Sequence, residues 1–533
     1  MILRNGTIRT LDPSLPSVSS LWIAGDRIAG GVGVHETSLP SPETVDLGGR
    51  CVLPGFTDSH VHFPTWALGR HDVRLHGCAS LAEALDAVRA APRSGTWLRG
   101  QGWRDADWPD GRPTRQALDE IEPARPAMLI SKDYHALWLN STALALAGGD
   151  LEVEGGVVVR DAGGEPTGVL YERAAWQFKE RYARAPDDEY VEAMREGVRV
   201  AAARGVTALH DKDGWLGAIG LWQRLEAQGG LPLRVWQSTP ADQLGQLRAI
   251  GLRSGAGSPL LRLGYLKAFM DGTLGSQTAW LSAGSAAGKA GDAQRETPRA
   301  FGPRPDNGSG VVITSGEELE EIVREAAEAG WPVGVHAIGD AANRAALDAF
   351  DRSREAWQPR GLRQRIEHAQ CLAPEDIARF AELGIAASVQ FLHAPSDEDL
   401  AKRYWADRLD RAYSFRSLLE SGALLANGSD APVEELEPWA GVVAAVLDHW
   451  RKDQRLTLEQ ALHAICVAPA WLSHDERNRG TLVPGRYADL VVLDRDPFAC
   501  EPAELREVQV VATMLGGRWT HNPPPWDCSD HAR

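Results

Sequence analysis

Two histidines one residue apart are the first candidates for chemistry. His60 and His62 end the segment 53–63, which reads LPGFTDSHVHF. A Pro-Gly turn precedes the segment, and Phe56 and Val61 suit a buried strand, so a strand is expected here. Because alternate side chains of a strand point to one face, both imidazoles can aim at the same point and supply half of a metal chelate. Alone, such a pair is more often two surface or packing histidines.

Further polar side chains end other segments that read as buried strands. They are Lys267, His336, His368 and Asp430. In a barrel of parallel strands these carboxyl ends meet at one mouth, where active sites form. Singly, each histidine could pack a strand end, Lys267 could be solvated, and Asp430 could cap a turn. Together with His60 and His62, they form a nitrogen and oxygen ligand set suited to zinc or another divalent metal ion.

The segments that carry these residues alternate with helical stretches. Strands are expected at 206–210, 261–267, 333–336, 365–368, 386–390 and 424–430. A helix is expected from Gly316 to Ala329, because Ser315 can cap it and apolar residues recur at helical spacing. Repeated strand–helix units favour a parallel sheet, and their number predicts an α/β fold with a closed (β/α)8 TIM barrel.

The rest of the chain surrounds this barrel, expected at 55–475. Residues 1–54 and 476–520 both read as short strands with turns, so we expect them to form one small β-sandwich domain. Residues 65–200 are rich in Trp, Arg, Gly and Pro, which predicts an insertion after the first barrel strand that covers the mouth. A long loop is expected at 284–310, and residues 521–533 form a tail.

The composition of the chain limits the kinds of molecule that the protein is expected to bind. The 533 residues carry 56 Lys plus Arg against 73 Asp plus Glu, a net charge of −17 that disfavours nucleic acid. No run of 18 apolar residues is present, and residues 1–6 lack the features of a signal peptide, so neither a membrane partner nor export is expected. These features predict a cytoplasmic protein with a small-molecule substrate, and they leave a homodimer open.

The order of short motifs resembles the amidohydrolase superfamily, and within it the amidohydrolase-3 or YtcJ-like branch, which includes N-substituted formamide deformylases. The motifs that carry the resemblance are PGFTDSHVH at 54–62, KAFMDG at 267–272, HAIGD at 336–340, IEHAQ at 366–370, GSDAP at 428–432 and GRYADL at 485–490. Each is weak alone, but six in this order are specific.

The resemblance implies a centre with two metal ions, expected to be zinc. His60, His62 and Asp430 would hold one ion, His336 and His368 the other, and Lys267, carboxylated by carbon dioxide, would bridge them. Two such ions lower the pKa of a shared water to about 7. The hydroxide would attack a polarised carbonyl, with Asp430 as the catalytic group that moves the proton to the leaving amine. The predicted reaction is hydrolysis of a non-peptide C–N bond in an amide or N-substituted formamide.

Three further residues are candidates for substrate binding. His135 lies in the segment DYHALWLN at 133–140, which resembles a family segment, although a structural histidine is an equal alternative. Asp271 could bind a polar substrate group or support its own loop. His393 could contact the substrate or stabilise an oxyanion. The nineteen tryptophans are compatible with an aromatic-lined pocket.

Other functions fit the same scaffold. A mononuclear deaminase would use the histidines and the aspartate but leave Lys267 unmodified, and a lactone or ester hydrolase is a related alternative. A non-catalytic binding or regulatory protein is the alternative from another class. The number of metal ions per chain separates the first alternative from the two-metal prediction.

Overall fold

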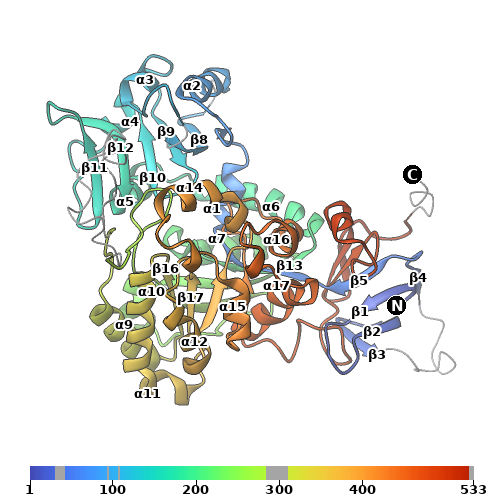
Figure 1. The fold of residues 1–533 in the computed structure, drawn as a ribbon. Coiled ribbons are helices and arrows are strands. Elements are labelled where there is room, and N and C mark those ends of the chain that lie inside the picture. Colours follow the sequence, from blue (N-terminus) through green and yellow to red (C-terminus); the bar gives the residue numbers. More distant parts are fainter. Residues whose placement is uncertain (31–42, 93–94, 106–107, 284–309, 527–533) are drawn as a thin grey trace.

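A barrel of eight parallel strands forms the centre of the computed structural model, which describes residues 1–30, 43–92, 95–105, 108–283 and 310–526 (Figure 1). The strands follow one another around the barrel in chain order: β6 (Phe56–Val61), β13 (Val206–Asp211), β14 (Arg234–Pro240), β15 (Leu261–Phe269), β16 (Val333–Ala337), β17 (Arg365–His368), β18 (Ala386–Val389) and β19 (Leu425–Asn427). Two backbone hydrogen bonds link the ends of this sheet, from the Asp430 nitrogen to the His60 oxygen and from the His62 nitrogen to the Ala431 oxygen. The predicted (β/α)8 barrel is confirmed.

The strand register aligns the carboxyl ends of β15, β16 and β17, which carry candidate site residues. Phe269 of β15 pairs with His336 of β16, and Ala337 pairs with His368 of β17. Parallel pairing in this register places the carboxyl ends of these strands at one mouth.

Helices pack around the barrel sheet and bury its outer face. They are α6 (Asp187–Ala203), α7 (Ala218–Ala227), α8 (Leu244–Ala249), α9 (Gly316–Ala329), α10 (Asp340–Arg352), α12 (Pro374–Leu383), α15 (Phe415–Glu420) and α17 (Leu458–Leu472). Shorter helices lie in the connections: α1 (Phe63–Gly69), α11 (Arg354–Trp357), α13 (His393–Ser396), α14 (Glu398–Tyr404) and α16 (Pro438–Val443). Helix α9 has the predicted bounds, and Ser315 forms a capping box with Glu318. None of the described helices combines the length and apolar character that crossing a bilayer requires.

Strand β14 was absent from the sequence-based expectation. It reads RVWQSTP, and all seven residues are buried. The polar residues Arg234, Gln237, Ser238 and Thr239 interrupt its sequence, so its pattern is not the run of apolar residues that marks a buried strand.

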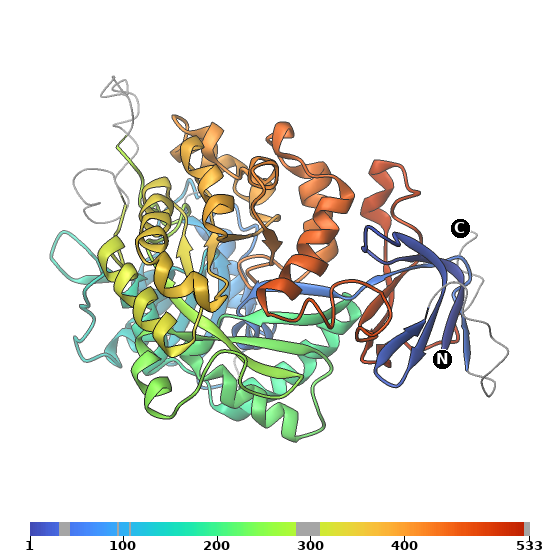
Figure 2. The same ribbon diagram turned by 90° about the horizontal axis from the view of Figure 1, so that it is seen from below.

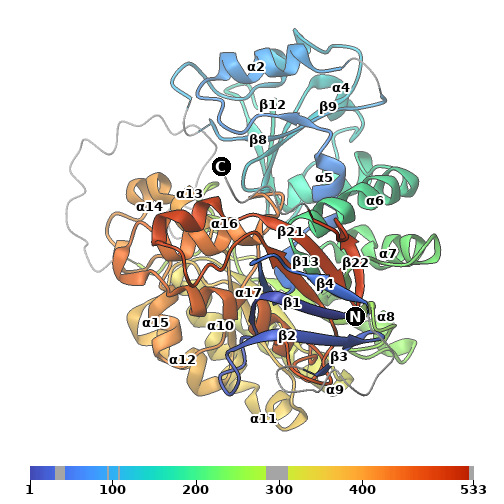
Figure 3. The same cartoon turned by 90° about the vertical axis from the view of Figure 1, so that its right-hand side faces the viewer.

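Strands from both ends of the chain form a second sheet beside the barrel (Figures 2 and 3). These strands are β1 (Ile2–Arg9), β2 (Ser17–Ala24), β3 (Arg27–Gly30), β4 (Thr44–Asp46), β5 (Cys51–Pro54), β20 (Leu490–Leu493), β21 (Val510–Leu515) and β22 (Arg518–His521). The two termini meet where β5 pairs antiparallel with β20, and the sheet has a hydrophobic core of its own. The small β-domain expected from both termini is therefore present.

A third sheet interrupts the barrel between β6 and β13 and lies at its carboxyl-terminal side (Figure 1). Its strands are β7 (Val73–Arg74), β8 (Leu98–Trp103), β9 (Ala127–Ser131), β10 (Ala136–Leu139), β11 (Gly156–Arg160) and β12 (Pro166–Glu172), with helices α2 (Leu81–Ala90), α3 (Arg115–Asp119), α4 (Ser141–Ala145) and α5 (Arg173–Tyr182). We call this segment, 73–182, the insertion. The loop expected at 284–310 falls, apart from residue 310, outside the described residues.

Candidate metal centre

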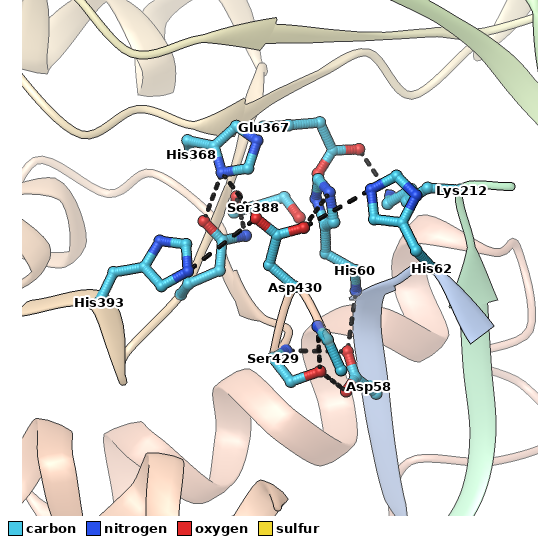
Figure 4. A network of polar contacts seen from close by, with 12 residues as sticks. Asp58, His60, His62, Lys212, Glu367, His368, Ser388, His393, Ser429 and Asp430 are labelled. Atoms are coloured by element: carbon cyan, nitrogen blue, oxygen red, sulfur yellow. Dashed lines mark hydrogen bonds and ion pairs between the residues drawn. The ribbon is translucent and has the colours of Figure 1, made fainter. Parts of the chain in front are cut away.

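The end of β6 and the loop after β19 meet at the barrel mouth (Figure 4). Asp430 Oδ1 lies 3.2 Å from His60 Nε2 and 3.6 Å from His62 Nε2. His60 is 1 % exposed, whereas the His62 side chain keeps 28 % of its surface accessible. The first and last barrel strands thus bring together three of the predicted ligands.

Asp58, which the sequence reasoning missed, fixes this junction. Its carboxylate accepts hydrogen bonds from the backbone nitrogens of His60 (3.1 Å) and Ser429 (3.0 Å), and from the Ser429 hydroxyl. Burial raises the pKa of Asp58 to about 6. The sequence did hold a signal for Asp58: it lies two residues before His60, so both side chains point to the same side of the strand.

His368 joins the group from β17. Ligand atoms of His60, His368 and Asp430 all lie within 4.8 Å of one another. The His336 ring, from β16, lies 4.5 Å from the His368 ring between centroids. His336 Nε2 is also 3.2 Å from the Gly272 carbonyl oxygen. The structure therefore brings the four predicted imidazoles and Asp430 to one place.

Lys267 reaches the same place from β15. The residue is 2 % exposed, and its Nζ atom has no hydrogen-bond partner among the described residues. Burial lowers the pKa of Lys267 to about 8. Lys212, a second lysine buried inside the barrel, donates instead to Glu367 Oε1 at 2.8 Å and contacts the Tyr265 hydroxyl. Of these two buried lysines, only Lys267 has an amine without a hydrogen-bond partner among the described residues.

Burial keeps the imidazoles of His60, His336 and His368 uncharged, which is the form that binds metal. Burial and the charge of Lys212 lower the pKa of His60 to about 4, and burial also holds the pKa values of His336 and His368 well below the usual range. Burial alone would raise the pKa of Asp430, but His60 and His368 hold it well below its ordinary value. At neutral pH the His60, His336 and His368 imidazoles are therefore uncharged and Asp430 is a carboxylate, a donor set that fits a divalent metal ion.

Hydrogen bonds behind the ligands set their orientation. His60 Nδ1 lies 2.8 Å from Glu367 Oε2, His62 Nδ1 lies 2.8 Å from Asp213 Oδ1, and His368 Nδ1 lies 2.7 Å from Gln390 Oε1. Partners of this kind fix the tautomer, so that Nε2 faces the metal. The signal for Asp213 was the charged run HDKD at 210–213, at the carboxyl end of β13.

Two of the predicted substrate-binding residues border the centre. His135, on the insertion, directs Nδ1 to Glu172 Oε2 at 2.6 Å, and its ring lies 5.6 Å from the His336 ring. Sequence reasoning missed Glu172. His393 Nε2 lies 3.9 Å from Asp430 Oδ2 and has no hydrogen-bond partner among the described residues.

The third, Asp271, supports a loop in this structure. Its carboxylate accepts hydrogen bonds from the backbone nitrogens of Ile338 (3.0 Å), Gly339 (2.8 Å) and Trp280 (2.8 Å). Asp340, the last residue of the motif HAIGD, pairs with Arg408 and Arg411. Both carboxylates are buried, and Asp271 braces the segment that follows His336 through its backbone nitrogens.

Comparison with known proteins shows the family to which this chain belongs. The model of the amidohydrolase-3 group, described as the amidohydrolase family, matches residues 43–521. The chain belongs to the amidohydrolase family. The resemblance drawn from the six motifs is thereby confirmed, and the barrel with its polar mouth is that of a hydrolase of the amidohydrolase superfamily.

Relatives of this amidohydrolase cover nearly the whole chain. Protein LONG AFTER FAR-RED 3 from Arabidopsis thaliana is 33% identical over 97% of this chain and 91% of its own length. The N-substituted formamide deformylase of Arthrobacter pascens is 27% identical over 97% of each protein. Among solved structures, an uncharacterised metal-dependent hydrolase from Pyrococcus horikoshii is 28% identical, with a TM-score of 0.75 over 94% of this chain and 99% of the other.

Proposed function

We propose that this amidohydrolase is a metal-dependent enzyme that hydrolyses a non-peptide C–N bond, in an amide or an N-substituted formamide. The relative from Arthrobacter pascens supports the formamide, and the relative from Pyrococcus horikoshii supports dependence on metal. The observation that carries the proposal is the unpartnered Lys267 amine among buried neutral imidazoles.

In this proposal, two divalent ions are held by the six candidate ligands. His60, His62 and Asp430 hold one ion, and His336 and His368 hold the other. The neutral Lys267 amine would bond through Nζ to the carbon of carbon dioxide and release one proton, and the resulting carbamate would supply negatively charged oxygen ligands to the ions. Zinc suits these nitrogen and oxygen donors, although another borderline divalent ion would also fit.

The ions would act as Lewis acids on the substrate carbonyl and on water. The chain supplies the rest. Asp430, kept ionised by its histidine neighbours, accepts the proton of the attacking water and returns it to the leaving nitrogen. His393 and His135 border the place of reaction, where each offers a nitrogen to the substrate. The expected products are formate or another carboxylate and a free amine.

Metal content and product release test the proposal together. We expect about two ions per chain by elemental analysis, and formate release from N-substituted formamides. Asp430→Asn should lower kcat by at least about 100-fold, since proton transfer by a positioned side chain contributes about 10²–10⁴-fold. Asp351→Asn, which changes an exposed carboxylate on α10, is the matched control and should retain activity. Metal-loaded protein that cleaves no amide, formamide, lactone or ester contradicts the proposal and favours a binding protein.

Modification of Lys267 has its own test. Protein equilibrated with ¹³C-labelled carbon dioxide and metal should give a carbamate carbon resonance. Lys267→Met should remove that resonance, whereas Lys402→Met, at an exposed lysine, should retain it. A resonance that persists without Lys267 would exclude this residue as the bridging ligand.

One observation favours a second candidate, the mononuclear deaminase. Only His60, His368 and Asp430 form a compact metal-binding group among the described residues. A measured content near one ion per chain, with ammonia as product, would support this alternative. The cytoplasmic location, the homodimer and the absence of nucleic-acid and membrane partners stay predictions.

A further inference from the structure

We propose that the insertion is a lid that swings away from the barrel mouth as a rigid body. Ion pairs between basic residues of the insertion and acidic residues in the segments that follow β18 and β19 hold it closed. Salt and surface charge then determine how often the mouth opens. This inference concerns the access of any ligand to the mouth, so it does not depend on the reaction.

The insertion has hydrophobic cores of its own. One buried cluster is built around Trp103 and Trp138, and a second around Leu170 and Phe178. Among the described residues, neither cluster includes a side chain from a barrel strand or from a helix around the barrel. A unit with its own core can move relative to its neighbour when the interface between them is polar rather than hydrophobic.

Three ion pairs link the insertion to the segments after β18 and β19. They are Arg104 with Asp399 (3.1 Å), Lys132 with Glu434 (3.2 Å), and Arg74 with Glu435. In each of these pairs the cation belongs to the insertion and the anion to the barrel. The three attractions therefore act together and draw the insertion towards the mouth.

These ion pairs are accessible to water and salt. Arg74 and Glu435 are 61% and 47% exposed, and Asp399 is 46% exposed. An exposed ion pair is weak, and each one changes the ratio of closed to open molecules by only about two- to fivefold. Interactions of this strength hold a lid closed without preventing it from opening.

The chain enters and leaves the insertion at one place. Helix α1 precedes the insertion and α6 follows it. Trp66 of α1 and Met194 of α6 belong to the same buried cluster, so the connections 70–72 and 183–186 both start from one packed corner. The ion pairs attach the insertion to the ends of two other strands. A hinge at this corner would therefore separate the pairs when it opens.

The contacts of the insertion with the loop after β15 are also compatible with opening. They are the hydrogen bonds from Thr273 to Asp133 (2.7 Å) and from Thr278 to Glu172 (2.6 Å), and a ring contact between Trp176 and Phe269. When the insertion lifts, water replaces the partners in both hydrogen bonds, which limits the net cost of breaking them.

Single-molecule energy transfer between the insertion and the barrel tests this inference. Dyes are attached to Ala145→p-azidophenylalanine on α4 and Ala378→p-azidophenylalanine on α12, which are both exposed positions. We expect a major population with higher transfer, the closed form, and a minor population with lower transfer, the open form. Raising NaCl from about 0.1 to about 1 M shortens the screening length from about 10 to about 3 Å and should enlarge the open population about twofold or more.

Charge reversal should open the lid without added salt. Arg74→Glu combined with Arg104→Glu replaces two attractions by two repulsions. It should enlarge the open population about fivefold or more at about 0.1 M NaCl. Salt screens repulsion as well as attraction, so higher NaCl should no longer favour opening in this variant.

Two further variants are the controls. Arg160→Glu combined with Arg181→Glu reverses two exposed arginines whose acidic partners lie within the insertion itself, and should keep the distribution of the wild type. Asp399→Arg added to Arg104→Glu rebuilds one pair with its signs exchanged, and should restore the closed form.

A single population that responds neither to salt nor to the two charge reversals overturns the inference. An equal response of the Arg160→Glu and Arg181→Glu control also overturns it, because the insertion would then loosen in a general way. If the reversed variant fails to fold, the salt titration of the wild-type charges decides alone, since a population that salt does not change contradicts the lid.

Discussion

Glu367 links His60 to positive charge inside the barrel. One carboxylate oxygen faces His60 Nδ1, and the other accepts a hydrogen bond from Lys212 at 2.8 Å and lies 2.9 Å from Arg365 Nε in an ion pair. All four side chains are at most 3 % exposed. Since Lys212 and Arg365 keep the pKa of Glu367 well below its usual value against the effect of burial, His60 always meets an anion.

Glu367→Gln should therefore weaken metal binding. The neutral amide no longer holds His60 in one tautomer, and loss of such a partner lowers metal affinity by about 10–100-fold. Chelator competition measures this affinity. Glu375→Gln, at a carboxylate that is 66% exposed, is the control. Unchanged affinity in Glu367→Gln would show that Glu367 has no part in orienting His60.

The sequence predicted which residues gather at the barrel mouth far better than the residues that hydrogen-bond to them. The six candidate ligand residues lie in short motifs at strand ends, where local pattern is informative. Lys212 and Glu367 are 155 positions apart, and His60 and Glu367 are 307 apart. Their roles arise from tertiary contact alone. The same holds for Glu172, whose link to His135 depends on how β10 and β12 pair.

At the scale of elements, the contact between β6 and the loop after β19 determines the spacing of the ligands. Gly428 lies against β6 so closely that a Cβ atom there would fall 2.2 Å from the His60 backbone nitrogen. A side chain at 428 would therefore force the two segments apart, and with them His60 and Asp430.

We expect Gly428→Ala to lower both the metal content and the thermal midpoint of unfolding. Overpacking of this kind costs about 1–3 kcal/mol. Gly220→Ala is the matched control, because a Cβ atom at this helical position meets nothing within 4 Å and should be neutral or slightly stabilising. Full metal content in Gly428→Ala would contradict the importance of this contact.

The hydrophobic pattern of the sequence identified the apolar barrel strands. It did not identify a barrel strand that buries polar residues. Strands β13 and β15 to β19 were expected within a few residues of their observed bounds. Strand β14 was missed, since the buried polar residues Arg234, Gln237 and Thr239 break the apolar pattern by which a buried strand is recognised. The insertion was expected as a segment, but the pairing of its strands was not.

At the scale of the whole molecule, a buried ion pair connects the barrel to the terminal sheet. Arg234, which begins β14, donates to Asp489, which precedes β20, at 2.7 Å and 3.1 Å. The side chains are 8% and 4% exposed. The terminal sheet is thereby tied to the barrel at the amino-terminal side, away from the metal centre at the carboxyl ends.

Asp489→Asn should destabilise the protein and leave the metal content of the folded fraction unchanged. Removing one partner of a buried pair costs about 3–5 kcal/mol, because the remaining charge stays buried. Thermal unfolding measures the loss. Glu398→Gln breaks an exposed pair with Lys402 and should cost at most about 1 kcal/mol. Equal midpoints for the two variants would contradict a role for Asp489 in joining the sheet to the barrel.

The pairing of β5 with β20 has a consequence for synthesis on the ribosome. The partner of β5 is translated more than 400 residues after β5 itself. At about 5–20 residues per second, the nascent chain waits roughly 20–90 s with this strand edge unsatisfied. An unpaired strand edge can pair with the strand of another chain and start aggregation. The supply of chaperones during expression should therefore determine the yield of correctly folded protein. Ribosome stalling before residue 490 would leave a product prone to aggregation.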